Sequence, residues 1–374
     1  MKIGLVCPYN MFRGGGVQEC VLALREGIVA RGHEAYIITP QPSDYKESPP
    51  EGFIFVGTGR MIRASHTTSD LAVSIDIARL QEVLDTYQFD ILHFHEPWVP
   101  IISRQLLSRS NAIHIATFHA AMSERRTSRT FEKVIIPYTK SILKYLDVMT
   151  AVSPTATNYV RSLTNRKIKI VPNGIDLSRY NHVETTLQPK SPKQILYVGR
   201  LEKRKGVNYL LNAFKELLII DPGYSLLIVG DGPDREKLED QVMLNAIPNV
   251  RFLGYVDDET KQRLLKESAV FCSPALYGES FGIVLLEAMA SGCVTVAGNN
   301  SGYASVLQDE GQISLVNPKD SLEFARRLHL LATNLPLREL WRKWALGSVS
   351  QYEYSEVVDQ YVAIYKEAYE KHKH

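Results

Sequence analysis

The sequence predicts an α/β protein made of two doubly wound domains in tandem. Short runs rich in β-branched residues alternate with longer segments of helical periodicity. The short runs are apolar almost without interruption, which is typical of parallel strands that are covered on both faces. A segment with linker composition and two prolines, 181–193, separates a first series of such units from a second. At 374 residues the chain is long enough for two domains with separate cores.

The first series predicts six strands with helices between several of them. The strands are expected at Lys2–Cys7, Ala35–Thr39, Ile91–Phe94, Ile113–Phe118, Val148–Val152 and Ile168–Val171. The helices include Val17–Ala30 and Ala78–Thr86. Sheets of this kind bind ligands beyond the carboxyl ends of their strands, so we expect a cleft between the two domains.

The second series predicts five more strands and five more helices. The strands are expected at Gln194–Val198, Ser225–Val229, Val250–Phe252, Val270–Ser273 and Thr295–Ala297. The helices are expected at Val207–Ile220, Asp234–Leu244, Thr260–Glu267, Ile283–Ser291 and Ser321–Ala332. A last amphipathic helix with aromatic residues is expected at Ser355–Lys371.

The composition indicates a soluble globular protein. The formal net charge of +2 does not indicate a nucleic-acid partner. No apolar run reaches the roughly 18 residues that cross a bilayer, and Lys2–Cys7 is too short for a signal-peptide core. The four cysteines lack metal-type spacing, and Cys7, Cys20 and Cys272 stand beside apolar residues as buried free thiols do. We therefore expect a cytoplasmic protein without structural zinc.

Two carboxylates stand eight residues apart in the segment 277–289, around a glycine-containing turn that enters an apolar helix. The backbone N–H groups of Ser280–Ile283 and the positive end of the helix dipole suit a diphosphate. Glu279 is expected in the loop, within reach of the hydroxyls of a sugar. Glu287 is expected about two turns inside the helix, within reach of a ribose. The alternative is two unrelated glutamates at a helix entrance.

In each domain a further candidate turn follows the first strand. Gly14–Gly16 lets the backbone approach a phosphate closely, although Glu19 stands where a dinucleotide fingerprint needs glycine and a plain tight turn is the alternative. Gly199–Gly206 carries four cations in six residues, and cations near a developing negative charge are an efficient catalytic device. The alternative is a solvated basic turn, and Lys203 and Arg204 are expected to be solvated.

Histidines mark the strand ends of the first domain. His119 ends an apolar strand, where it can hydrogen-bond to a sugar hydroxyl or share charge with a phosphate. His93 and His95 are expected to alternate on the preceding strand, so that only one of them reaches the cleft and the other is structural.

The segment 254–261 follows a strand of the second domain, where a nucleobase is expected. Guanine presents N–H donors beside a carbonyl acceptor, a pattern that Asp258, Lys261 and the backbone of Val256 complement. Guanine is therefore favoured over uracil. Acids at a helix start are also common simply as caps, which leaves uracil open.

Together these segments resemble family-4 retaining glycosyltransferases of the two-domain GT-B fold. The resemblance rests on Gly-Gly-Val-Gln, His-x-His-Glu-Pro, Thr-Phe-His, Pro-Asn-Gly-Ile-Asp, Gly-Arg-x4-Lys-Gly, Gly-x-Val-Asp-Asp-x-Thr-Lys and Gly-Glu-Ser-Phe-Gly-Ile-Val-Leu-x-Glu-Ala-Met. Within the family the chain looks like the bacterial phosphatidylinositol mannosyltransferases, which transfer mannose from GDP-mannose to a membrane lipid. The resemblance implies a peripheral place on the inner face of the plasma membrane.

The resemblance also implies domains and residue roles. The acceptor-side domain is expected at 1–183, the donor-binding domain at 184–350, and a helix that crosses back to the first domain at 351–374. The implied catalytic residues are His119, Arg200, Lys205 and Glu279. The implied donor-binding residues are Gly15, Gly16, Val256, Asp258, Lys261, Ser280, Phe281, Gly282, Ile283 and Glu287. Gln18 and Glu96 are implied on the acceptor side. No cofactor or metal is implied: the chain has no Asp-x-Asp triplet, so the arginine and lysine take the role of a divalent ion.

The acceptor half departs from the family pattern. The lipid-side loop and basic helix have no clear equivalent at 65–70 or 77–86, and Glu124 stands where a lysine serves the inositol phosphate. A substitute is expected in a basic and apolar stretch that begins with Arg125, Arg126, Arg129 and Lys133. The alternative is an ordinary exposed loop and helix.

Other functions stay open at this point. The donor can be a UDP-sugar, with glucosyl or N-acetylglucosaminyl transfer to a soluble sugar or a protein. A non-catalytic sugar-nucleotide-binding protein is an alternative of another class, and a GT-B epimerase or phosphorylase is a third. The sequence does not indicate an oligomeric state.

Overall fold

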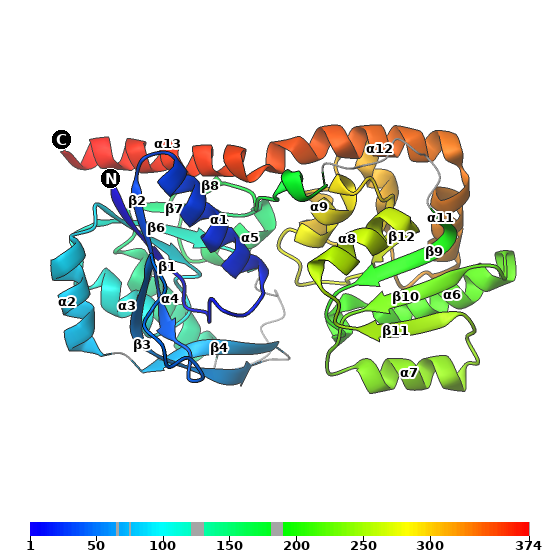
Figure 1. The fold of residues 1–374 in the computed structure, drawn as a ribbon, viewed down its shortest axis with the longest axis horizontal. Helices are drawn as coiled ribbons and strands as arrows, with labels where there is room; N and C mark the ends of the chain where they lie inside the picture. The colour runs from blue at the N-terminus through cyan, green and yellow to red at the C-terminus, as the bar shows by residue number, and fades with distance from the viewer. Residues whose placement is uncertain (65–66, 75, 121–130, 181–189, 374) are drawn as a thin grey trace. The chain divides into compact units, whose positions relative to one another are not determined.

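The computed structural model describes residues 1–64, 67–74, 76–120, 131–180 and 190–373, and it divides into two compact units (Figure 1). Unit 1 comprises Met1–Gly174 and Tyr354–His374, and unit 2 comprises Ile175–Glu353. These borders lie at 174/175 and 353/354, whereas the resemblance implied 183/184 and 350/351. Unit 2 begins before the two prolines of the linker-like segment. Ile175 already pairs with Glu353, the last residue of unit 2, in an isolated parallel bridge.

Unit 1 is built on an eight-stranded sheet in the order β4-β3-β2-β1-β5-β6-β7-β8. The strands are β1 (Lys2–Val6), β2 (Glu34–Gln41), β3 (Phe53–Ala64), β4 (Thr67–Ser74), β5 (Ile91–His95), β6 (Ile113–Phe118), β7 (Val148–Ala151) and β8 (Ile168–Ile170). Its helices are α1 (Gly16–Ala30), α2 (Ile77–Tyr87), α3 (Ile102–Leu107), α4 (Ile136–Leu143), α5 (Pro154–Arg161) and α13 (Tyr354–Lys373), with a π turn at Phe131–Ile135. The six expected strands are present, and the β3–β4 hairpin adds an antiparallel edge that was not expected.

The helix α13 belongs to unit 1, as the resemblance implied, and both chain ends lie in this unit (Figure 1). Its apolar face packs with α1 against one face of the sheet, and a Cβ at Gly27 of α1 would lie only 2.6 Å from Val358. Two tyrosines of α13 also reach polar groups of the strands. The Tyr365 hydroxyl lies 2.7 Å from His93 Nδ1, and the Tyr361 hydroxyl lies 3.1 Å from the Thr117 hydroxyl. This helix therefore supports the strand ends that carry the histidines.

Unit 2 has a six-stranded parallel sheet in the order β11-β10-β9-β12-β13-β14. The strands are β9 (Ser191–Val198), β10 (Ser225–Val229), β11 (Val250–Gly254), β12 (Ser268–Ser273), β13 (Thr295–Gly298) and β14 (Leu315–Val316). The helices are α6 (Val207–Ile220), α7 (Arg235–Leu244), α8 (Asp258–Glu267), α9 (Ile283–Ala290), α10 (Ser301–Ala304), α11 (Ser321–Thr333) and α12 (Leu335–Val349). All five expected strands and five expected helices are present, and both units are doubly wound α/β folds.

The cysteines and the helix lengths were also considered in the sequence. All four cysteines are buried free thiols. Among the residues that the structure describes, no helix has the length and apolar character needed to cross a membrane.

Candidate active site

The site of unit 2 lies where the order of its strands reverses. The chain runs from β9 to β10 and β11 and then returns to β12 on the other side of β9. The loops after β9 and β12 therefore meet at the carboxyl ends of the strands, the ligand-binding edge of such sheets. The N–H of Leu276 donates to the carbonyl of Arg204 at 2.8 Å. A Cβ at Gly206 would lie 2.3 Å from the carbonyl oxygen of Pro274, so this close approach requires a glycine.

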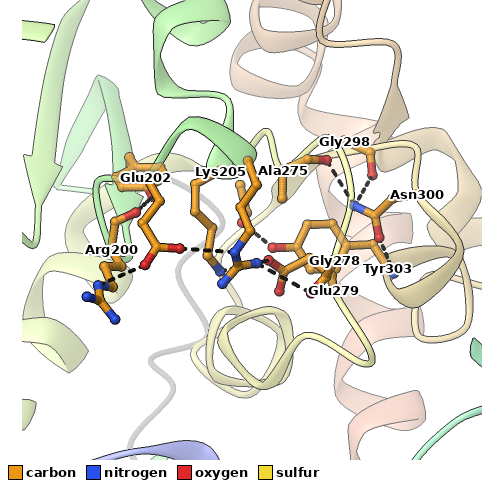
Figure 2. A network of polar contacts seen from close by, with 12 residues as sticks. Arg200, Glu202, Lys205, Ala275, Gly278, Glu279, Gly298, Asn300 and Tyr303 are labelled. Carbon is orange, nitrogen blue, oxygen red and sulfur yellow. Dashed lines mark hydrogen bonds and ion pairs between the residues drawn. The ribbon is translucent and has the colours of Figure 1, made fainter. Parts of the chain in front are cut away.

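A chain of ion pairs joins these two loops (Figure 2). Glu202, whose side chain is 3% exposed, pairs with Arg200 Nε at 2.9 Å and with Arg204 Nε at 3.0 Å. Arg204 continues to Glu279 of the second loop, at 2.5 Å from Nη1 to Oε1. Lys205 Nζ reaches the same oxygen at 2.9 Å. The structure therefore brings Arg200, Lys205 and Glu279, three residues singled out in the sequence, into one network. Arg204 is also part of it, so the prediction of a solvated side chain at this position was wrong.

The network carries three cations and two carboxylates. Burial raises the pKa of Glu279, but Lys205 and Arg204 outweigh burial and hold this pKa below its usual value, so the carboxyl is ionised at neutral pH. One positive charge is left over when the five groups are counted together. The set therefore favours an anion at the switch point of the sheet.

The helix α9 begins directly beyond Glu279. Its N-cap is Gly282 with φ of +109°, and no side chain caps it. The N–H of Leu285 donates to the Gly282 carbonyl at 2.9 Å, and the positive end of the helix dipole at Gly282 and Ile283 favours an anion. The side chain of Phe281 is buried, with its ring centroid 5.5 Å from that of Tyr352, so only the backbone of Phe281 can meet a ligand.

The loop that holds Glu279 is fixed from a third side. Asn300 Nδ2 donates to the carbonyl of Ala275 at 2.9 Å, and Asn300 Oδ1 accepts from the N–H of Tyr303 at 3.0 Å (Figure 2). A Cβ at Gly302 would lie 2.0 Å from the carbonyl oxygen of Glu279. These residues were not predicted from the sequence. The Asn-Asn-Ser-Gly stretch at the start of α10 is typical of a capped helix start and was the available signal.

Glu287 lies about one turn inside α9, not two, because it is the fifth residue of a helix that begins at Ile283. Lys261 of α8 brings two predicted donor-binding acids together: its Nζ lies 2.8 Å from Glu287 and 3.0 Å from Asp258. Burial lowers the pKa of Lys261, but Glu287 and Asp258 more than offset this and raise it above the usual lysine value. Asp258 is the first residue of α8 and is 63% exposed, and Val256 lies in the preceding loop.

His95 and His119 form a buried pair in unit 1, with His95 Nδ1 2.9 Å from His119 Nε2. Burial lowers the pKa of His119 to about 4, so this imidazole is neutral at physiological pH. The expected alternation of His93 and His95 was wrong, because side chains repeat every two residues along a strand and both rings lie on one face, with centroids 4.3 Å apart. His93 is the structural one, held by Tyr365 and by Thr117.

Cys20 of α1 lies beside this pair, and the three side chains each place one potential ligand atom within 4.8 Å of the others. Burial raises the pKa of Cys20 to about 12, which keeps the thiol neutral. The three residues come from separate elements, so sequence spacing could not reveal the group.

Glu96 organises the strand ends of unit 1. It has a φ of +53° and is buried, and its carboxyl accepts hydrogen bonds from the N–H groups of His119, Ala120 and the Trp98 indole. Burial raises the pKa of Glu96 to about 8, although the backbone donors lower it. Glu96, a predicted acceptor-side residue, is thus committed to holding the loop that carries His119.

The other predicted residues of unit 1 lie around the start of α1 and near α4. Gly15 is the N-cap of α1, Gly16 is its first residue, and Gln18 Nε2 donates to the carbonyl of Asn10 at 3.3 Å. Arg125, Arg126 and Arg129 lie outside the described residues. The expected basic and apolar stretch continues through Lys144; in it Lys133, Val134, Lys140 and Lys144 are exposed, whereas Ile135, Ile136 and Tyr138 are half-buried.

Two doubly wound units, one with a cation network and an uncapped helix at its switch point, define the architecture of a glycosyltransferase. Residues 14–179 match the family described as "Glycosyltransferase Family 4", and residues 179–346 match "Glycosyl transferases group 1". A phosphatidyl-myo-inositol mannosyltransferase of Mycobacterium leprae is 33% identical over 98% of this chain and 96% of its own. A D-rhamnosyltransferase of Pseudomonas aeruginosa is 26% identical over 81% of this chain and 79% of its own. The chain belongs to glycosyltransferase family 4.

Solved structures agree on the fold. A sucrose-phosphate synthase from Thermosynechococcus elongatus has a TM-score of 0.79 at 20% identity, with 99% of both chains covered. The Anabaena protein HepE, solved with UDP-glucose, has a TM-score of 0.75 at 16% identity, over 98% of this chain and all of its own (100%). The fold of this chain is therefore GT-B.

The buried carboxyl of Glu96 predicts a pH-dependent stability. With a pKa of about 8 in the folded protein and 4.5 as the ordinary value, its proton stabilises the fold fully below about pH 4.5, and this contribution is lost as the pH rises through about 8. Glutamine does not titrate. The advantage of the unmodified protein over Glu96→Gln, measured as a difference in thermal midpoint, should therefore shrink from about pH 5 to about pH 8. The exposed Glu26→Gln serves as control, and a difference that is independent of pH would contradict the assignment.

Proposed function

We propose that this glycosyltransferase moves mannose from GDP-mannose to the headgroup of a membrane lipid, with retention of configuration and without a metal ion. The observation that supports the proposal most is the ion-pair network of Arg200, Glu202, Arg204, Lys205 and Glu279 beside the uncapped start of α9. The 33% identity to a mannosyltransferase along nearly the whole chain supports the donor sugar and the lipid acceptor.

In this proposal Arg200 and Lys205 hold the leaving diphosphate. The bond between the anomeric carbon and the diphosphate oxygen breaks, and the acceptor hydroxyl bonds to the same face of that carbon. The acceptor proton passes to the diphosphate oxygen, so no protein base is needed. Negative charge grows on the diphosphate as the bond breaks, and the two cations stabilise it where it develops. The N–H groups at the start of α9 supply the positive end of a helix dipole for the same anion.

The carboxylates orient the donor rather than react. Glu279, held ionised by Lys205 and Arg204, accepts from hydroxyls of the sugar. Glu287 accepts from the ribose, and Asp258 accepts from the N–H groups of guanine. His119 is neutral and hydrogen-bonds to the sugar. Gly15 and Gly16 have no side chains and let the backbone approach the phosphate and the sugar of the donor. A UDP-sugar-dependent transfer to a soluble sugar or protein is the second candidate, since Asp258 is the first residue of α8 and 63% exposed, and an acid there can serve the helix dipole rather than a guanine.

The charge on Arg200 and Lys205 should determine turnover. Replacing either residue by alanine should lower kcat on the order of 10²-fold, the scale for a deleted group that stabilises charge in the transition state. The exposed Lys203→Ala in the same turn should retain the activity of the unmodified enzyme, measured as GDP release. Activity should also survive excess chelator. Strict dependence on added manganese or magnesium would show that the two cations do not replace a metal.

The guanine assignment predicts a selective loss of binding. Asp258→Ala should weaken GDP binding by about 1.5 to 3 kcal/mol, the scale of a hydrogen bond to a charged group, and should leave UDP binding nearly unchanged. Titration calorimetry measures both, with the neighbouring exposed Glu259→Ala as control. If the unmodified protein binds UDP more tightly than GDP, the donor is a UDP-sugar and the mannose assignment fails.

The lipid acceptor predicts binding to anionic membranes. Each basic residue near an anionic surface contributes about 1 kcal/mol, so changing all four members of the basic cluster to glutamine should release the protein from anionic vesicles in flotation assays. The cluster is Arg125, Arg126, Arg129 and Lys133. The matched control changes four exposed lysines of unit 2 and should still float: Lys215, Lys237, Lys266 and Lys319. Donor binding should persist in both. An unmodified enzyme that ignores anionic vesicles and glycosylates a soluble sugar or peptide would contradict the lipid acceptor.

A further inference from the structure

Glu202 is a buried acid in the middle of a basic turn. Its side chain is 3% exposed, and its two carboxylate oxygens lie 2.9 Å from Arg200 Nε and 3.0 Å from Arg204 Nε (Figure 2). A buried carboxylate costs several kcal/mol in lost hydration unless cations compensate it. The two arginines supply that compensation, and in return one carboxylate fixes two flexible cations.

The backbone of the turn directs this carboxylate inward. Glu202 N–H donates to the carbonyl of Arg200 at 3.0 Å, and the Glu202 carbonyl accepts from the N–H of Lys205 at 2.9 Å. The Tyr197 hydroxyl donates to the carbonyl of Arg200 at 2.9 Å. These hydrogen bonds hold the backbone of the turn in one conformation. In that conformation the side chain of Glu202 is buried and lies against the side chains of Arg200 and Arg204.

Arg204 transmits this constraint to the second loop. It binds Glu202 through Nε and Glu279 through Nη1, and Lys205 binds the same oxygen of Glu279. Removing the charge of Glu202 would free Arg200 directly. It would also leave Glu279 as the one carboxylate partner of Arg204 in this network. Arg204 would then be free to move toward Glu279, which would change the position of that carboxylate.

We propose that Glu202 is a positioning residue that holds Arg200 and, through Arg204, Glu279 in the geometry that transfer requires. The proposal rests on the function proposed for this site. It deepens that function, because it assigns the alignment of the phosphate-binding Arg200 and the sugar-binding Glu279 to a side chain that has no direct contact with phosphate or sugar in the proposed complex. Reacting groups displaced by about 1 Å can cost about 10²-fold in rate, so alignment of this kind is large enough to measure.

The test compares Glu202→Gln with the unmodified enzyme. Glutamine keeps the shape of the side chain but carries no charge, so it loses the ion pair with Arg200 and retains at most the hydrogen bond that Arg204 Nε donates. We expect kcat to fall about tenfold to 100-fold, with the GDP dissociation constant changed less than about threefold, because the cations stay present but lose their alignment. A merely structural role would instead lower kcat, GDP affinity and the thermal midpoint together.

Two further variants sharpen this result. Glu267→Gln is the matched control, because Glu267 also lies near two cations, at 3.4 Å from Arg263 and 3.9 Å from Lys190, at the opposite end of α8 from Asp258. It should leave kcat unchanged. In a double-mutant cycle, Glu202→Gln should cost much less in an Arg200→Ala background than in the unmodified enzyme, since one of its two targets is already absent.

The outcomes separate this proposal from the proposed function. An unchanged kcat in Glu202→Gln, or additive losses in the cycle, would overturn the positioning role while GDP-mannose turnover by the unmodified enzyme still stands. If the unmodified enzyme turns over a UDP-sugar instead, the proposed donor is wrong. The same comparison made with that donor then supports or overturns the role of Glu202.

Discussion

Two carboxylates shielded from water hold three cations together at the switch point of unit 2, and the rest of the candidate site depends on this balance. Without Glu202 and Glu279, the three cations of the turn would repel one another in a partly buried place. With them, the turn after β9 is fixed to the loop after β12, and one positive charge is left for an incoming anion. The cations are thus already positioned in the folded protein before substrate binds. Preorganised charge of this kind is what efficient stabilisation of a leaving group requires.

In unit 1, polar groups at the strand ends are also held in place by buried partners, but the histidines among them are neutral. One face of its sheet is apolar along β1, β2 and β6 and becomes polar at the carboxyl ends, where α13 contributes Tyr361 and Tyr365. Burial keeps His119 neutral, and Glu96 fixes the loop that carries it. The helix that ends the chain therefore contributes to the polar end of the sheet as well as to its core.

The sequence predicted the parts of this structure that local patterns encode. Continuous apolar runs located the parallel strands, and the spacing of Glu279 and Glu287 located the loop and the helix of the site. The antiparallel pair of β3 and β4 was not predicted: Phe53–Val56 is an apolar run like those of the predicted strands, but residues 57–74 carry no regular apolar alternation. Arg204 was taken for a solvated side chain, because its partner Glu279 stands 75 residues further along the chain. Pairings of that range are set by the reversal of strand order and not by any local signal.

In the proposed reaction Arg200 and Lys205 receive the diphosphate directly, and Glu202 holds Arg200 in place. A crystal structure of the enzyme with GDP-mannose, grown with excess magnesium, decides whether they do. We expect diphosphate oxygens within hydrogen-bond distance of Arg200 and Lys205, with Glu202 still paired with Arg200 and no metal ion between protein and phosphate. A diphosphate held by magnesium, with Arg200 and Lys205 turned away from it, would show that these cations do not receive it.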